Sequence, residues 1–125
     1  MAKAKAPVIK WLTKAEAHDY PAALSYPSLI YDEREAAKVV RRLRNARGRE
    51  FKAKDILRAS QLSPLGVSNS HVLKDRKKIM KGRALSALLL VRDSIRGKVI
   101  IADGYHRLCA VYEFDEDAVI PCKIV

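Results

Sequence analysis

The run Asp103-Gly104-Tyr105-His106-Arg107 combines residue types that suit the handling of phosphate. It follows the apolar stretch Val99–Ala102, which predicts a strand, and it opens a stretch that predicts a helix. Free backbone N–H groups at a helix start, together with the helix dipole, make a site for anions. Arg107 can donate two parallel hydrogen bonds to phosphate oxygens, and His106 can donate one and adds charge when protonated. The pattern predicts a phosphate site at this junction.

The same junction also has a purely structural interpretation. Asp103 is a good N-cap residue, Gly104 is a common turn residue, and the two basic side chains can simply face solvent. Under the phosphate hypothesis, Gly104 instead removes a side chain that would clash with an approaching phosphate. Composition and spacing leave both interpretations open.

The C-terminal half of the chain predicts the elements that position this junction. Two strands, Ala87–Arg92 and Lys98–Ala102, are joined by a turn at Ser94–Gly97. A helix from Tyr105 to about Phe114 follows, and a last strand covers Val119–Val125. This order predicts an α+β fold with a small mixed β-sheet and packed helices.

The N-terminal half predicts helices alone, so that the sheet is preceded by an all-helical segment at residues 10–62. The capping box Thr13–Glu16 predicts a short helix that ends before Pro21. Asp32-Glu33 begins the clearest amphipathic helix, which Gly48 ends. Further helices are predicted at about 52–60 and 71–80, with a loop at 62–69. We expect one compact domain with a flexible basic tail at 1–9, the helical segment at 10–62 and the core at 63–125.

The charge is strongly positive, +11 for 125 residues, and it is clustered. The block Lys38–Arg58 holds nine basic residues, and Lys74–Arg83 holds six. Such clusters favour partners that carry phosphate, either nucleotides or nucleic acid. Phe51 is the only aromatic residue in the first block, which argues against binding single strands by base stacking. The candidate nucleic-acid contacts are Arg41, Arg42, Arg44 and Arg47.

Several classes of protein are not expected from this composition. The longest apolar runs are far shorter than the roughly 20 residues that cross a bilayer, and no hydrophobic core of a signal peptide follows Met1–Pro7. We therefore expect a cytoplasmic protein without a membrane partner. Cys109 and Cys122 do not have the spacing of a metal or redox motif and are interpreted as buried small apolar residues.

Residues 70–125 resemble the ParB/sulfiredoxin superfamily. The matching segments, in order, are Ala84–Val91, Gly97–Ala102, Gly104–Ala110 and Ile120–Val125. In that superfamily a Gly-x-x-Arg segment cradles the phosphates of a nucleoside triphosphate. The resemblance implies ATP or CTP as the ligand, with Gly104, Tyr105, His106 and Arg107 as contacts and with Lys74, Lys77 and Lys78 facing the same pocket in part.

The departures from the superfamily narrow the expected activity. Sulfiredoxins have their reactive cysteine where this chain has Tyr105, so the repair of sulfinic acid is not expected. Partition proteins carry a Glu-Arg-Arg motif and a separate helix-turn-helix domain, so a CTP-dependent DNA clamp is not expected either. The Asp-Gly-x-His-Arg form is most similar to members that include free-serine kinases, which implies a catalytic role for Asp103. Magnesium would also be needed, and beyond Asp103 its candidate ligands are Asp32, Glu33 and Asp75, from which we assign no metal site.

Three functional hypotheses remain open on the sequence. The first is a nucleotide-binding protein with NTPase, kinase or nuclease-type phosphoryl-transfer chemistry, in which Asp103 and His106 are catalytic. The second is a regulator that binds DNA or RNA through its basic helices without catalysis. The third is an interaction protein that keeps the fold for its surface.

Overall fold

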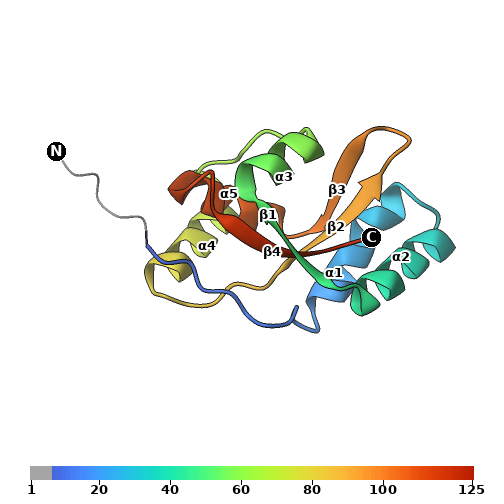
Figure 1. Cartoon of the computed structure of the whole chain (residues 1–125), viewed down its shortest axis with the longest axis horizontal. Coiled ribbons are helices and arrows are strands. Elements are labelled where there is room, and N and C mark those ends of the chain that lie inside the picture. The colour runs from blue at the N-terminus through green and yellow to red at the C-terminus, as the bar shows by residue number, and fades with distance from the viewer. Residues whose placement is uncertain (1–6) are drawn as a thin grey trace.

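The computed structural model describes residues 7–125. Within this range the chain forms five α-helices, a short 3-10 turn and one four-stranded sheet (Figure 1). The elements are α1 (Asp19–Ser25), η1 (Pro27–Leu29), α2 (Glu33–Asn45), β1 (Gly48–Lys52), α3 (Ala53–Ser60), α4 (Ser70–Met80), β2 (Leu88–Asp93), β3 (Lys98–Asp103), α5 (Tyr105–Phe114) and β4 (Val119–Ile124).

The sheet has the order β1-β4-β2-β3. The pair β4–β2 is parallel, and the pairs β1–β4 and β2–β3 are antiparallel. The prediction of an α+β fold with a small mixed sheet is therefore confirmed. The expectation of an all-helical segment at residues 10–62 is wrong, because β1 lies within it and forms one edge of the sheet. Its burial pattern explains the miss, since only Phe51 is half-buried and the other four positions are exposed.

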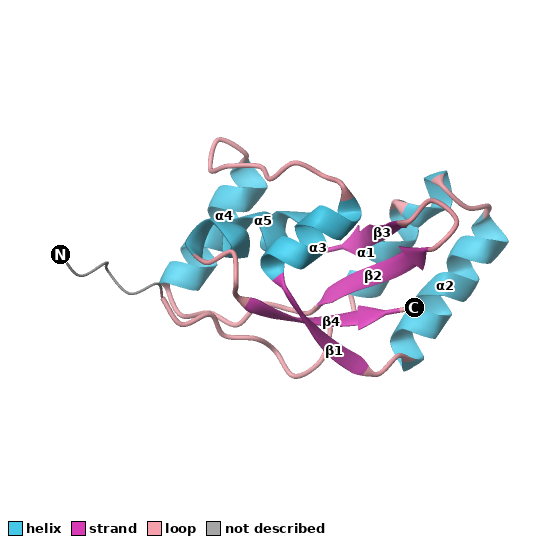
Figure 2. Ribbon diagram, turned by 45° about the horizontal axis from the view of Figure 1, so that its top comes forward, coloured by secondary structure: helices cyan, strands magenta, loops and turns pink. Residues whose placement is uncertain are grey.

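Helices cover both faces of the sheet, and each face has its own core (Figure 2). Leu88 and Leu90 of β2 point to the face that α3, α4 and α5 cover, whereas Leu89 and Val91 point to the face that α1 and α2 cover. All four side chains are at most 5% exposed. A strand that is buried on both faces needs a continuous apolar run, which is what the sequence of β2 contains.

Helix α2 forms for the reasons that its sequence suggests. The Asp32 carboxylate accepts a hydrogen bond from the Glu35 N–H at 2.8 Å and so caps the helix start. Ala36, Val39, Val40 and Leu43 form its buried stripe. The helix ends at Asn45, three residues before the predicted stop, because the chain must turn at 46–47 to enter β1 at Gly48.

Helix α1 corrects the predicted capping box. Residues 13–16 are not helical, and the helix runs from Asp19 to Ser25 through Pro21 instead of ending before that proline. Proline is tolerated in the first turn of a helix, where its missing N–H has no intrahelical partner to lose. The Asp19 carboxylate accepts a hydrogen bond from the Glu16 N–H at 2.9 Å, so an aspartate organises this bend in place of a Thr13 cap.

The predicted flexible tail at residues 1–9 lies mostly outside the described residues. Ile9 and Trp11 pack against the larger core, and the Leu12 N–H donates to the Leu85 carbonyl at 2.8 Å.

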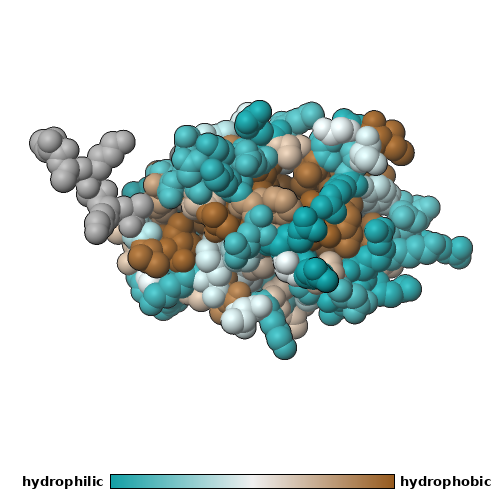
Figure 3. All heavy atoms as spheres, in the orientation of Figure 1, coloured by the Kyte–Doolittle hydropathy of each residue, from teal (hydrophilic) through white to brown (hydrophobic). Residues whose placement is uncertain are grey.

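Hydrophilic side chains cover the end of the molecule that α2 forms (Figure 3). None of the helices described between residues 7 and 125 combines the length and the apolar character that a membrane span requires.

Candidate functional site

The junction of β3 and α5 is built as a tight turn. Strand β3 ends at Asp103, and Gly104 has φ +108°, a left-handed conformation that favours glycine, before α5 begins at Tyr105. A Cβ at Gly104 would lie 2.7 Å from Leu88 Cγ and 3.0 Å from Arg107 Nη2. The glycine is thus required by the core and by Arg107 within the chain itself, which differs from the predicted role of leaving room for a phosphate.

A hollow of about 180 Å³ lies between this turn and α4, and we call it the turn hollow. It brings together most of the residues that the sequence proposed as phosphate contacts. Lys77 is the exception, because it lines only a neighbouring groove, which Lys74, Lys78, Lys81 and Arg83 also line. The residues that line the turn hollow are His71, Lys74, Asp75, Lys78, Asp103, Gly104, Tyr105, His106 and Arg107.

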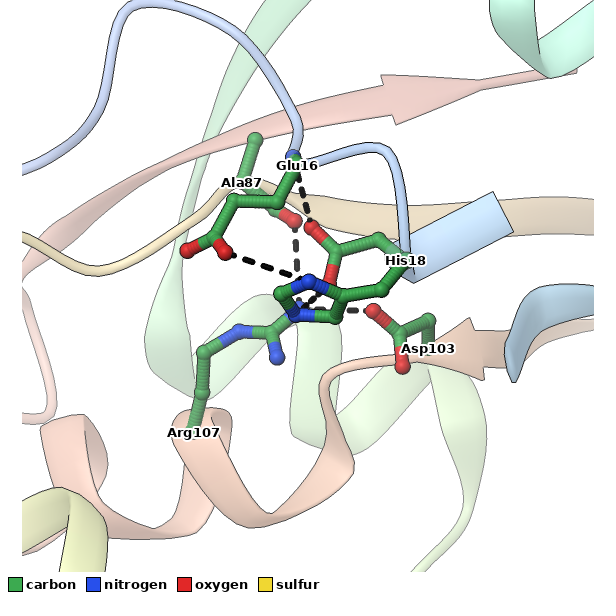
Figure 4. A network of polar contacts seen from close by, with 6 residues as sticks. Glu16, His18, Ala87, Asp103 and Arg107 are labelled. Carbon is green, nitrogen blue, oxygen red and sulfur yellow. Dashed lines mark hydrogen bonds and ion pairs between the residues drawn. The ribbon is translucent and has the colours of Figure 1, made fainter. Parts of the chain in front are cut away.

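Arg107 is held from within the molecule (Figure 4). Its Nη2 donates to the Asp103 carboxylate at 2.9 Å and to the Ala87 carbonyl at 3.3 Å. Both charged side chains are only 16% exposed, and Arg107 Nε finds no hydrogen-bond partner among residues 7–125. One edge of the guanidinium therefore stabilises Asp103, so the predicted two parallel hydrogen bonds to phosphate would need another edge or a rearrangement.

Asp103 has a second acidic neighbour that the sequence did not reveal. Burial raises the pKa of the Asp103 carboxyl above its usual 3.8, the Arg107 guanidinium lowers it, and the nearby Asp19 carboxyl raises it further. Asp19 is itself only 2% exposed. Burial and the neighbouring Asp19 thus act on the pKa of Asp103 in the same direction, and Arg107 opposes both.

Side chains of the bend before α1 surround Asp19. His18 Nε2 lies 3.4 Å from Asp19 Oδ1, and His18 Nδ1 lies 3.2 Å from Glu16 Oε2. The histidine is 73% exposed although the carboxyl that it contacts is buried, and Figure 4 shows it beside Glu16 and close to Asp103 and Arg107. Residues 16–19 thus form a wall of the Asp103 environment, although they are more than 80 positions away in the sequence.

The His106 ring faces a second histidine across the turn hollow. The ring centroids of His71 and His106 are 4.8 Å apart, tilted by 34°. Burial lowers the pKa of His106 first, and His71 and Arg107 lower it further, while Asp75 opposes them. A bound anion would counter these effects and favour the protonated form of His106.

A larger hollow of about 380 Å³ lies on the other side of the same turn. It shares residues 103–106 with the turn hollow and extends along β3, the edge strand. Tyr26 and Leu62 also line it, and their side chains are exposed by 50% and 44%. The Tyr105 hydroxyl donates to the Ser63 carbonyl and ties the loop before α4 to the turn. The turn is thus flanked by a polar hollow and a more apolar one.

The acidic residues proposed as magnesium ligands are separated by the fold. Asp75 and Asp103 both line the turn hollow, whereas Asp32 and Glu33 belong to the start of α2 and do not. No cluster of three or more His, Cys, Asp or Glu side chains that could hold a metal occurs within residues 7–125. A magnesium ion here would thus rely on phosphate oxygens and one or two carboxylates, which is its usual way of binding.

The arginines proposed for nucleic acid are mostly brought together elsewhere. Arg41, Arg42 and Arg47 line a hollow of about 560 Å³, joined by Arg49 of β1 and Arg92 of β2. We call it the arginine hollow. Arg44 does not line it, because its guanidinium stacks on the Tyr20 ring, 4.4 Å from the centroid.

Neither cysteine has the environment of a reactive thiol. Both are free and only 1% exposed. Burial raises the pKa of Cys122 to about 12 and raises the pKa of Cys109 as well, even though the Leu65 N–H donates to Cys109 Sγ at 3.4 Å. Thiolate chemistry at the site would have to overcome this burial.

Comparisons of the chain with protein-family models, with curated proteins and with solved structures find no match to any of them.

Proposed function

We propose that the chain binds the phosphates of a nucleoside triphosphate at the turn hollow and acts there as a phosphoryl-transfer enzyme. The observation that carries the proposal is the convergence of Lys74, Lys78, His71, His106 and a helix start on one space of about 180 Å³. Two lysines and the free N–H groups of a helix start favour anions, and the imidazole N–H groups of His71 and His106 can donate to phosphate oxygens.

The size of the turn hollow fits phosphate groups better than a whole nucleotide. Sites that enclose entire small molecules have volumes of about 300–1,000 Å³. The hollow of about 380 Å³ along β3 shares the turn residues 103–106 and presents Tyr26 and Leu62. In our proposal the phosphates lie against α4 and α5, and the sugar and base extend across the turn to these side chains.

Asp103 is the residue that we propose as the proton acceptor. Its raised pKa makes its carboxylate a stronger base than an ordinary surface aspartate. Arg107, which also lines the turn hollow, holds the carboxylate in place through Nη2. Asp103 would take the proton of the attacking hydroxyl or water, while His106 and the lysines neutralise charge that develops on the transferred phosphoryl group.

Magnesium fits this donor set. Asp75, which lines the turn hollow, would hold it together with phosphate oxygens as a hard oxygen ligand, and Asp103 would stay available to accept the proton. When bound, the ion would neutralise charge on the phosphates and favour transfer.

Membership in the ParB/sulfiredoxin superfamily is part of the same proposal. It is supported by the order α4, β2, β3, α5 and β4, which is the order of elements that the resemblance implies. It is also supported by the position of the Gly-x-x-Arg segment at the start of α5. The acceptor class that the resemblance suggests is a small hydroxyl compound such as free serine, with water as the alternative acceptor.

The binding half of the proposal is tested by thermal denaturation with ATP, CTP and GTP, each with and without magnesium. A ligand at 100 times its Kd adds about 2.7 kcal/mol, which raises Tm by about 10 °C for a chain of this size. We expect one nucleotide to stabilise the wild type and to lose most of this effect with the variant Lys74→Gln/Lys78→Gln. The matched control Lys81→Gln/Arg83→Gln removes two charges near the same helix end but outside the turn hollow. Stabilisation by none of the three nucleotides, or equal losses in both variants, would contradict the proposal.

The catalytic half is tested by measuring the nucleoside diphosphate that is released, with and without free serine. The variant Asp103→Asn keeps an acceptor for Arg107 but cannot take up a proton at neutral pH. We expect it to bind nucleotide and to turn it over at least about 100-fold more slowly, in line with the contribution of a general base. Release that depends on serine identifies a kinase, and release without an acceptor identifies an NTPase. A wild-type rate of turnover in Asp103→Asn would show that Asp103 takes no part in the reaction.

A further inference from the structure

The arginine hollow concentrates positive charge from four separate segments of the chain. Arg41 and Arg42 come from the last turns of α2, Arg47 from the loop that follows, Arg49 from β1 and Arg92 from β2. All five side chains are exposed. The fold thus collects guanidinium groups that are up to about 50 positions apart in the sequence.

Among residues 7–125, no acidic side chain lines this hollow. Asn45, Ala46, Ile124 and Val125 are the other residues of the lining, and none of them carries an acidic side chain. Among the residues that the structure describes, none of the five arginines forms an ion pair, although seven such pairs occur elsewhere. Five like charges that surround a concave surface repel one another, and a bound polyanion would relieve this repulsion.

The arginine hollow is separate from the turn hollow. Asp103 pairs with Leu89 at the beginning of β2, whereas Arg92 lies near the end of that strand and its N–H donates to the Val125 carbonyl. In Figure 2 the two regions accordingly lie at opposite ends of the sheet, with α4 and α5 at one end and α2 and the C-terminus at the other. A ligand of the turn hollow therefore does not occupy this surface.

We propose that the arginine hollow binds the phosphate backbone of a nucleic-acid duplex without reading its sequence. A duplex presents one negative charge for about every 1.7 Å of its axis, which suits several guanidinium groups set side by side. Arginine also donates in parallel pairs to phosphate oxygens.

The lining argues against two other partners. A protein interface has an apolar, often aromatic centre, and this hollow offers only small patches from Ala46, Ile124 and Val125. Single strands are bound by stacking on aromatic side chains, and no aromatic residue lines the hollow. What remains is a concave, basic, non-aromatic surface, which fits contacts with a duplex backbone.

The test is fluorescence anisotropy of the full chain with a labelled duplex of about 20 base pairs across a series of salt concentrations. The logarithm of the binding constant falls with the logarithm of salt with a slope of about −0.9 for each phosphate contact, so five contacts give about −4.5. We expect the variant Arg42→Gln/Arg47→Gln to bind at least about tenfold more weakly and to reduce the slope by about 1.8.

The matched control is Arg34→Gln/Lys38→Gln, which removes two exposed charges from the first half of α2 that do not line the hollow. We expect it to bind nearly as the wild type does, and circular dichroism checks that both variants are folded. Equal losses in the two variants, or a wild-type slope near zero, would overturn the proposal. So would tighter binding of a single strand of the same length, or of an acidic peptide, than of the duplex.

The duplex site stands independently of the proposed enzyme. The variant Lys74→Gln/Lys78→Gln should lose stabilisation by nucleotide and keep most of its duplex affinity, and Arg42→Gln/Arg47→Gln should show the reverse. A common loss of both activities in both variants would mean that a single surface binds both ligands, and it would overturn the assignment of a second site.

Discussion

Arg107 and the arginines of the arginine hollow carry the same charge in opposite circumstances. Arg107 is 16% exposed and is compensated by Asp103, which is itself near Asp19. The arginines of the hollow are exposed and have no acidic partner among the described residues. A charge that leaves water must be paired, whereas an exposed charge is solvated and can stay unpaired. The first kind of arginine therefore belongs to the folded structure, and the second kind is available to a partner.

The variant Asp103→Ala gives the strongest test of this comparison between the paired Arg107 and the exposed arginines. The substitution leaves the Arg107 guanidinium mostly buried and without its carboxylate, a situation that costs about 3 kcal/mol in comparable pairs. We expect the free energy of unfolding in urea to fall by about that amount. The control is Glu113→Ala, which removes one partner of the exposed pair with Arg76 and should cost less than about 1 kcal/mol. Similar losses in the two variants would mean that the burial of the Asp103–Arg107 pair has no energetic consequence.

Gly104→Ala tests the backbone that brings the pair together. The new Cβ meets Leu88 Cγ at 2.7 Å, and φ +108° is unfavourable for alanine. We expect a loss of about 2 kcal/mol in the free energy of unfolding from strain and crowding together. Gly48→Ala is the control, because a Cβ there meets nothing within 4 Å and Gly48 has no positive φ. If Gly104→Ala is as stable as Gly48→Ala, the turn is not constrained as described.

The region around the ion pair of Asp103 and Arg107 was only partly predictable from the sequence. The turn at 103–107 follows from a strong apolar strand and a glycine, and α5 was predicted with its observed bounds of Tyr105 and Phe114. The neighbouring Asp19 was not predicted, because the contact between residues 19 and 103 depends on how α1 packs against β3. One local signal was present. Asp19 and Pro21 stand in the first turn of α1, as acidic residues and prolines often do.

For the arginine hollow, the sequence predicted the positive charge but not which residues line the hollow. The block 38–58 contains four of the five arginines of the hollow, yet Arg92 lies more than 30 residues beyond it on β2. Arg44 was included among the candidate nucleic-acid contacts because it is near the others in the sequence, but its guanidinium stacks on the Tyr20 ring. Likewise, the sequence could not separate Lys77 from Lys74 and Lys78, because the rotation of α4 about its axis decides which lysines face the turn.

The pH dependence of stability sharpens the comparison, because burial raises the pKa of the Asp103 carboxyl. The folded-state pKa of Asp103 lies above 3.8, so the folded chain takes up a proton at pH values at which the unfolded chain does not. The contribution of Asp103 to stability must then fall as pH rises from 3.8 through the folded-state pKa, and it stays constant above it. We expect the free energy of unfolding of the wild type, relative to Asp103→Asn, to decline over this window in urea titrations. A relative stability that rises with pH would show that the attraction of Arg107 outweighs burial.

The smallest expected effect on stability comes from an arginine of the arginine hollow. Arg42→Gln removes one of five like charges and breaks no ion pair among the described residues. The free energy of unfolding should therefore rise by about 0.3 kcal/mol at low salt. The gain should disappear in about 0.5 M salt, since repulsion between exposed charges is screened there. Paired urea denaturation curves at the two salt concentrations measure it. A clear loss of stability would mean that Arg42 supports the fold, and the contrast with Arg107 would then no longer hold. A salt-sensitive gain would show that repulsion among the exposed arginines of the hollow destabilises the folded chain.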